Sequence, residues 1–430
     1  MNLLNKKINI TMSARSVLAL SSTLLVCIFV VLGTFNNVFS YLGLALAAIS
    51  IVFFPQEDVL CLFMFIMPFA NIFKNAPDAQ SFFTYLTLFY VVYKFVRARH
   101  TNVKFIFAFL VMCTFLLLQM LISVSMLRII KFVANILFVY FVVDHEQYSD
   151  NNKKIYMYFI YGVVLSSIIV TVGIIPNLVD YVGIKDLGGA YDQLERFSGM
   201  YVDPNHYSIN LIISLCLIII LNGRKQLKLG PSILLSIVLV AFSIMTFSKS
   251  AFLMLFLPLI MLLYVKIKSG KYLIFVCLLF AIVFVSLSVL AGRIEAFDII
   301  LSRFSDADDV NSLTTGRTDI WLNYLEHFTD SGLQLIFGGG FGAKVVEGHA
   351  AHNTYIDLIH FLGILGTAIF VAILRILAKI GEKAHIKNFL NHSVWICVLI
   401  MYFFLSKLFY FDWPFHIAIA ILVSRTNLSN

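Results

Sequence analysis

The chain has 430 residues, of which 60% are hydrophobic and 13% charged, and its formal net charge is +8. Its mean hydropathy is +0.93, which excludes an ordinary water-soluble domain and indicates an integral membrane protein. The six cysteines stand singly within apolar runs, so we expect buried thiols rather than disulfides or a metal site.

Long apolar runs without strand-like alternation predict an all-α polytopic membrane protein, because hydrocarbon offers the backbone no hydrogen-bond partner outside a helix or a closed barrel. The first run follows Lys6, Lys7 and Arg15 but lacks a small-residue cleavage site, so we expect a retained helix rather than a signal peptide. We expect 12 to 14 transmembrane helices, since the runs at 59–73, 82–96 and 414–425 are short enough to be re-entrant or partly interfacial. In chain order the predicted segments lie near residues 16–33, 38–54, 59–73, 82–96, 104–125, 127–143, 155–176, 207–222, 231–247, 250–267, 272–291, 353–378, 393–411 and 414–425.

The distribution of cations predicts how these helices are oriented. If the N-terminus is inside and all the runs span, most of the 31 lysines and arginines face the cytoplasm, in agreement with the positive-inside rule. We therefore expect a single integral membrane domain over residues 1–430, with both termini cytoplasmic. Two larger extracytoplasmic loops follow from this topology, at 177–206 and 292–351, and long loops commonly hold functional groups.

The longer loop contains a predicted amphipathic helix from Arg317 to Phe328. Its apolar residues recur at helical spacing, at Ile320, Trp321, Tyr324 and Leu325. Such a helix would lie on the outer membrane face or cap the helical bundle. Ordinary packing of a loop helix against the bundle is an equal alternative.

Two glycine-containing segments and one acidic run are interpreted as structural features rather than ligand-binding sites. FGGGFGAK, residues 337–344, lacks the spacing of a phosphate-binding loop, and we expect a flexible turn that returns the chain to His352. Gly363 and Gly366 predict close helix packing. The acidic run Asp306, Asp308 and Asp309 lacks the ligand positions of a calcium loop and predicts a solvated turn.

Polar side chains gather where the next helix should begin, within GHAAHNTYIDLIHFLGILG, residues 348–366. If that helix starts near Ala351, then Asn353, Asp357 and His360 share one of its faces. Ionisable groups inside a span usually face a cavity or a partner, so Asp357 and His360 have either a functional role or a structural role as an ion pair.

His352 is the best candidate for a general base, because it lies at the predicted boundary between membrane and water. A neutral imidazole with a pKa of about 6.5 takes up a proton readily. A solvated surface histidine is the alternative. Glu347 and His349 offer the beginnings of a metal site, but the spacing of known zinc motifs is missing, so we expect no metal.

Cations stand at three positions next to predicted outer connections. Arg196 offers a planar fork of donors suited to phosphate oxygens, and Asp203 and Asn205 follow it with the potential to orient polar groups. Lys249 lies in a short connection between two apolar runs, and Arg317 opens the loop helix, where a guanidinium and a helix N-terminus together suit an anion. Interfacial snorkelling and ordinary turn chemistry are the alternatives for these cations.

Four segments, in this order, resemble the O-antigen ligase and polymerase family of bacterial membrane enzymes. They are RFSG and DPN at 196–205, TFSKSAF at 246–252, TTGRTDIW at 314–321, and AHNTY followed by FLGILG at 351–366. The resemblance covers residues 195–370, and the N-terminal half agrees only in being helical and apolar. Lysine stands at 249 where many relatives have arginine, and the adjacency of His352 and Asn353 favours a polymerase over a ligase.

The resemblance implies an inverting, metal-independent glycosyltransferase without a cofactor, whose fold is similar to the GT-C class. Its donor and acceptor would be glycans on undecaprenyl diphosphate, and its site would face outward from the cytoplasmic membrane. Arg196, Lys249 and Arg317 would hold the diphosphate, and His352 would deprotonate the attacking hydroxyl. Asn353, Asp357 or Tyr355 would orient His352.

The resemblance leaves three functions to compare. A polymerase passes the growing O-antigen or capsular chain to another lipid-linked repeat, whereas a ligase passes finished polymer to the lipid A core. A polysaccharide or lipid exporter is the alternative from another class, although exporters more often have matched repeats and a polar site in mid-membrane. Besides the bilayer, a chain-length regulator is a further candidate partner, and no feature predicts nucleic-acid binding.

Overall fold

The computed structural model describes residues 14–76, 79–97, 101–145, 152–175, 196–269, 316–380 and 389–425. These residues form helices and connections without a strand, so the predicted all-α class is confirmed for the described part of the chain. Five of the helices are long and apolar enough to cross a membrane. They are α1 (Ala14–Leu32), α6 (Met126–His145), α7 (Lys153–Thr171), α9 (Pro204–Gly223) and α17 (Thr354–Lys379).

Further helices match most of the other predicted runs. They are α2 (Asn37–Phe53), α3 (Gln56–Ile66) with the 3-10 turn η1 (Met67–Phe69), α4 (Phe82–Arg97), α5 (Val103–Gln119), α10 (Leu229–Met245), α11 (Lys249–Ser269), α18 (Phe389–Phe403) and α19 (Trp413–Arg425). The predicted segment 272–291 lies outside the described residues, so the count of 12 to 14 spans stays a prediction.

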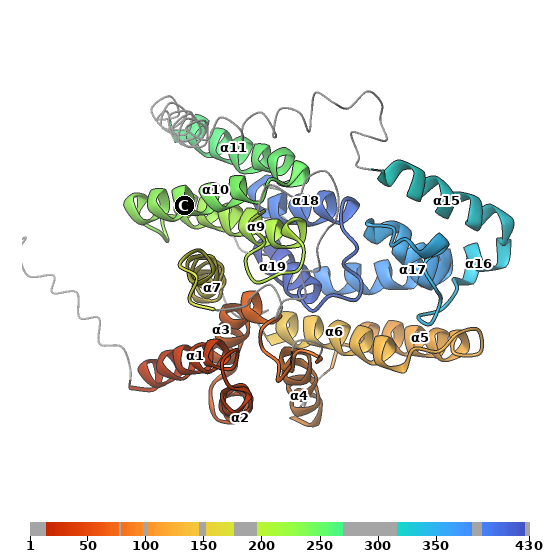
Figure 1. Cartoon of the computed structure of the whole chain (residues 1–430), viewed down its shortest axis with the longest axis horizontal. Coiled ribbons are helices and arrows are strands. Elements are labelled where there is room, and N and C mark those ends of the chain that lie inside the picture. Colours follow the sequence, from red (N-terminus) through yellow and green to blue (C-terminus); the bar gives the residue numbers. More distant parts are fainter. Residues whose placement is uncertain are drawn as a thin grey trace, which may run out of the picture.

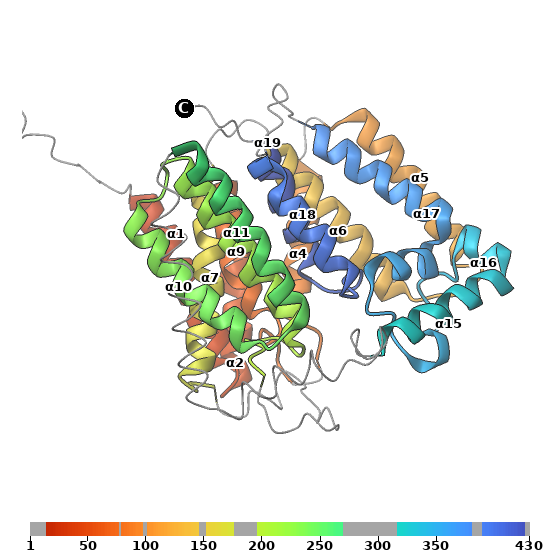
Figure 2. The same ribbon diagram turned by 90° about the horizontal axis from the view of Figure 1, so that it is seen from above.

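The helices divide into three neighbouring groups. Helices α1, α7, α9, α10 and α11 lie toward one end of the molecule, and α5, α15, α16 and α17 lie toward the other (Figures 1 and 2). Helices α4, α6, α18 and α19 lie between them. Helix α9 is buried over nearly its whole length, because it is apolar all round and packs against α7, α10, α11 and α18.

The longer of the two predicted outer loops contains two helices and a 3-10 turn. Helix α15 (Arg317–Asp330) confirms the predicted amphipathic helix, and it is followed by α16 (Gly332–Phe337) and the 3-10 turn η3 (Val346–Gly348). The buried side chains of α15, Tyr324 and Phe328, pack against Ala351. Helix α15 therefore packs on the start of α17, which is the bundle-packing alternative. Residues 292–315 of this loop, which include the acidic run at 306–309, and residues 177–195 of the shorter loop lie outside the described residues.

Helix α17 is broken at Gly363, whose backbone has φ 66°. The break frees backbone carbonyls, and the glycine-rich segment hydrogen-bonds to them. The amides of Gly339 and Gly340 donate to the carbonyls of His360 and Phe361 at 2.8 and 3.1 Å. A helix interrupted inside a protein keeps its polar backbone satisfied in this way. Residues 337–344 do contain a turn, at 341–342, but the prediction of a flexible one was wrong, because the backbone of Gly339 and Gly340 is hydrogen-bonded to α17.

Three predicted boundaries also differ from the structure. Helix α5 ends at Gln119 instead of 125, because the Gln119 side chain turns away to donate to the carbonyls of Phe337 and Phe361. Helix α17 starts at Thr354, three residues after the predicted start, because Asn353 caps it. Helix α18 ends at Phe403, so residues 404–412 are an irregular connection and not the end of a span.

Candidate functional site

The first turn of α9 is shaped by a carboxylate cap. The Asp203 side chain accepts hydrogen bonds from the backbone amide of Asn205 at 2.7 Å and from its side-chain amide at 2.8 Å. Pro204 occupies the first helical position, where the lack of an amide proton costs nothing. An aspartate at this position also interacts favourably with the helix dipole. The DPN sequence thus fixes where α9 begins and which way Asn205 points.

Arg196 and the short connection between α10 and α11 meet at this turn. The guanidinium of Arg196 donates to the Thr246 carbonyl at 3.1 Å and, more weakly, to the Asn205 side-chain oxygen at 3.5 Å. The same oxygen accepts a hydrogen bond from the Ser248 hydroxyl at 2.6 Å. Lys249 follows Ser248 directly as the first residue of α11. The Asn205 side-chain oxygen therefore joins the segment that carries Arg196 to the connection that precedes Lys249.

Arg317 reaches this region from the longer loop. It opens α15 directly after Gly316, whose φ of 78° turns the chain into the helix. Its guanidinium donates to the Phe404 carbonyl at 2.8 Å, and further donors of the five on a guanidinium remain for other acceptors. Burial lowers the pKa of Arg317, and the nearby carboxylate of Asp203 acts in the opposite direction. The arginine keeps its charge, since its ordinary pKa is far above neutrality.

His352 lies in the connection before α17, with its backbone in the left-handed region at φ 48°. The neighbouring residues fix this conformation. The Trp321 indole of α15 donates to the Ala351 carbonyl at 2.8 Å, and the Asn353 side chain accepts from the amides of Tyr355 and Ile356 as the helix cap. Burial lowers the pKa of His352 below its usual value, and the charge of Arg317 lowers it further. The imidazole is therefore neutral at neutral pH.

Asp203, Arg317 and His352 form one electrostatic cluster, which we call the outer cluster. The positive charge of Arg317 and the negative charge of Asp203 both act on His352, and Asp203 acts on Arg317. These residues come from three segments that are separated by 35 positions or more. The structure thus brings together the predicted base, one predicted cation and one predicted orienting residue, with Arg196 and Lys249 at the adjoining turn.

The remaining predicted residues of α17 have separate surroundings. Asn353 serves as the helix cap, and the Tyr355 hydroxyl donates to the Leu399 carbonyl of α18 at 2.8 Å. Asp357 is buried. His360 lies 2.9 Å from the Lys344 carbonyl and packs its ring against Tyr324 of α15, with centroids 5.2 Å apart. No hydrogen bond between His360 and Asp357 is present among the described residues, so the ion-pair alternative for these two residues is not observed.

The sequence analysis missed four residues next to the outer cluster. Lys407 and Asp412 form a fully buried ion pair at 2.6 Å, and the Lys407 ammonium also lies 3.4 Å from the His206 carbonyl. The His206 ring lies 4.1 Å from that of Tyr410, which is within electrostatic range of Asp203. A lysine inside the predicted span 393–411, with an aspartate directly after it, was the available signal.

The described residues contain no group of three or more histidine, cysteine, aspartate or glutamate side chains that could hold a metal ion. The four buried cysteines and the half-buried Cys113 of the described part are free thiols. The outer cluster places the guanidinium of Arg317 beside a neutral imidazole, with Arg196 and Lys249 at the adjoining turn. Such an arrangement suits transfer reactions whose leaving group is anionic.

Comparison with known protein families, curated proteins and solved structures finds no match to this chain. The resemblance to the O-antigen ligase and polymerase family consequently rests on the four motifs alone. Their residues are the ones that supply the outer cluster and the turn beside it.

Proposed function

We propose that this protein polymerises oligosaccharide repeat units linked to undecaprenyl diphosphate into O-antigen or capsular polysaccharide. The reaction would be an inverting glycosyl transfer at the outer face of the bacterial cytoplasmic membrane, in a multi-pass protein with a GT-C-like fold and both termini in the cytoplasm. The observation that carries the proposal is the meeting of Asp203, Arg317 and His352 in one cluster, with Arg196 and Lys249 beside it.

The cations stabilise the leaving group in this proposal. As the bond between the anomeric carbon and the phosphate oxygen breaks, negative charge grows on the carrier diphosphate. Arg317 is already held by the Phe404 carbonyl, so its remaining donors are pre-oriented and need little reorganisation as the charge develops. Arg196 and Lys249 extend the positive field along the turn. Asp203 and Asn205 hold this arrangement in place through the hydrogen bonds of the first turn of α9.

His352 is the general base for the acceptor. A hydroxyl of the acceptor sugar attacks the anomeric carbon from the face opposite the diphosphate, and its proton passes to the neutral imidazole. The new glycosidic bond forms as the old bond to phosphate breaks, and the carrier diphosphate leaves. General-base catalysis of this kind contributes on the order of 10² to 10⁴ in rate. Asn353 positions His352 by fixing the start of α17, while Tyr355 and Asp357 support the same helix.

The test is an assay with purified protein and a synthetic diphosphate-linked repeat, in which products are separated by length. The wild type should give a ladder, and His352→Asn should abolish it, because asparagine tolerates the left-handed backbone but removes the base. His392→Asn, at an exposed position of α18, is the matched control and should retain the ladder. A normal ladder from His352→Asn would remove the base assignment.

The same assay separates the polymerase from the two other functions. When lipid A core is added, a ligase transfers sugar to the core and leaves the carrier-linked repeats at their original length. An exporter moves the repeat across vesicle membranes without changing its length. Either result in place of the ladder would contradict the proposed polymerase.

A further inference from the structure

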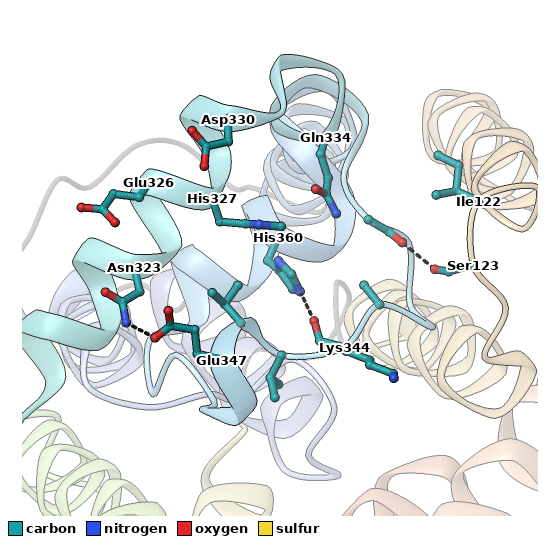
Figure 3. Close-up of a pocket in the computed structure, with 14 residues that line it drawn as sticks. Ile122, Ser123, Asn323, Glu326, His327, Asp330, Gln334, Lys344, Glu347 and His360 are labelled. Atoms are coloured by element: carbon teal, nitrogen blue, oxygen red, sulfur yellow. Dashed lines mark hydrogen bonds between the residues drawn. The ribbon is translucent and has the colours of Figure 1, made fainter.

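A polar pocket separate from the outer cluster lies between α15, α16 and the segment that leads to α17 (Figure 3). Its volume is about 620 Å³, which is in the range of small-molecule sites. None of the residues of the outer cluster lines this pocket. The charged and amide side chains that line it are Asn323, Glu326, His327, Asp330, Gln334, Lys344 and Glu347, and Ser123 and His360 complete its polar wall.

His360 presents an unsatisfied acceptor in this wall. Its Nε2 atom lies 2.9 Å from the Lys344 carbonyl oxygen, so Nε2 carries the proton and donates, because a carbonyl can only accept. In the neutral ring Nδ1 is then an acceptor, and this buried atom has no hydrogen-bond partner among the residues that the structure describes. His360 is only 1% exposed, and its ring lies between His327 and Lys344 (Figure 3). A buried acceptor calls for a donor, and a ligand hydroxyl would supply one.

The other polar groups of the pocket suit a ligand rich in hydroxyls. The Gln334 amide is directed into the space beside His327 (Figure 3), and an amide both donates and accepts. Glu347 is held by a hydrogen bond from the Asn323 amide. Carboxylates accept hydrogen bonds from hydroxyls strongly. This mixture of fixed acceptors and donors fits a saccharide, whereas a lipid chain would leave the same groups without partners.

The charge of the pocket sets a preference among saccharides. Glu326, Asp330 and Glu347 contribute three carboxylates against the single ammonium of Lys344. A uronic acid or another anionic sugar is repelled by this excess of negative charge, while neutral and amino sugars are accepted.

The pocket is held at a fixed spacing from the outer cluster. Arg317 and His327 are ten residues apart on α15, which corresponds to about 15 Å along a helix. On the side of α17, the Tyr324 hydroxyl donates to the His349 carbonyl at 2.9 Å and ties α15 to the segment that carries His352. The two sites therefore form parts of one rigid assembly.

We infer that this pocket binds neutral or amino sugars of the glycan at a distance from the reacting anomeric carbon. The inference rests on the proposed function, because it assigns the remote part of the same lipid-linked substrate. Binding energy from such remote sugars holds the reacting end in place and is recovered as rate.

The ligand is the oligosaccharide that mild acid releases from the carrier lipid of the producing cells. Its binding to the full-length protein in detergent is measured by calorimetry. Gln334→Ala and Asp330→Asn should each raise the dissociation constant roughly fivefold. This is the change expected when at least one hydrogen bond to the ligand is lost. Leu333→Ala is the control, since this neighbour is 74% exposed and lies outside the pocket lining.

The outcomes separate the two proposals. If the wild type does not bind the oligosaccharide, or Gln334→Ala and Asp330→Asn bind it unchanged, the glycan pocket is overturned, even when the ladder assay succeeds. If the oligosaccharide binds as described but no ladder forms, the polymerase proposal fails and the pocket stands. Equal loss in Leu333→Ala would point to a general disturbance of α16 and would also overturn the pocket.

Discussion

His352 owes its properties to three local circumstances, namely a left-handed backbone, partial burial and a neighbouring arginine. The first is set by the cap of α17 and the Trp321 hydrogen bond, and the other two lower its pKa. A lowered pKa keeps the imidazole unprotonated over a wider range of pH, at the cost of some basicity. The residue is therefore available as a base at neutral pH.

The dependence of activity on pH tests this electrostatic setting. Activity requires the neutral imidazole of His352, whose pKa is lowered. We therefore expect kcat/KM to be at its maximum at neutral pH and to fall only below pH 6.5, the ordinary pKa of histidine. Arg317→Gln removes a charge that lowers the pKa, so the acidic limb of residual kcat/KM should move to higher pH. Asp203→Asn removes a charge that raises it, so the limb should move to lower pH.

These two opposite shifts distinguish an effect on the base from a general loss of activity. The measurement is the pH profile of kcat/KM for each variant, which reports groups of the free enzyme. A wild-type limb above 6.5, or shifts in the same direction for both variants, would contradict the assignment.

At the scale of elements, α17 and the glycine-rich segment depend on one another. Gly338 and Gly363 both have positive φ, and a side chain at either would collide with the backbone of the other. The three glycines at 338–340 allow this backbone contact, and Ser123 and Arg128 hold the same segment by donating to the carbonyls of Gly339 and Phe341. The contact shapes both the break in α17 and the wall of the glycan pocket.

A pair of glycine variants measures the contribution of this contact to stability. Gly338→Ala places a Cβ 2.5 Å from the Phe361 carbonyl oxygen in a backbone with φ 77°, so it adds a collision to the cost of the left-handed backbone. Gly348→Ala has almost the same φ, 79°, but meets nothing within 4 Å. It should lose only about 1 to 2 kcal/mol, and Gly338→Ala should lose at least about twice as much.

Thermal unfolding in detergent is the measurement for both variants, with the melting temperature as the readout. Equal melting temperatures would show that the close approach of the two backbones contributes nothing to stability.

At the scale of the whole molecule, the proposed function requires that the outer cluster and the glycan pocket open to the same side of the membrane. Both lie at segments that the positive-inside rule assigns to the outside, and α15 contributes to both. The connections at the opposite ends of α9 and α10 carry Arg224, Lys225 and Lys228, as expected of a cytoplasmic side.

Labelling of introduced cysteines tests this orientation. In a cysteine-free background, Glu347→Cys in whole cells with a permeable outer membrane should react with an impermeant maleimide, because this side chain is exposed. Lys228→Cys, also at an exposed position, should react only after the cells are opened. The reverse pattern would place the outer cluster in the cytosol and end the proposed mechanism.

The sequence by itself determined the features that depend on local patterns. Hydropathy gave the helical class, helical spacing located α15, and the apolar runs beginning near 207 and 353 located the starts of α9 and α17 to within a few residues. Such features follow from interactions between residues close in the chain, which any reader of the sequence can evaluate.

Only the tertiary structure decided which distant residues meet. The break of α17 against Gly338, the irregular segment 404–412 with its Lys407–Asp412 pair, and the pocket around His360 each join segments far apart in sequence. Hydropathy placed residues 404–411 in a span because they are mostly apolar, yet the buried ion pair and the bond from Arg317 to Phe404 hold them out of a helix. These contacts depend on side-chain packing and on hydrogen-bond partners for backbone groups that a helix leaves unpaired. Local sequence does not reveal which distant residues meet either requirement.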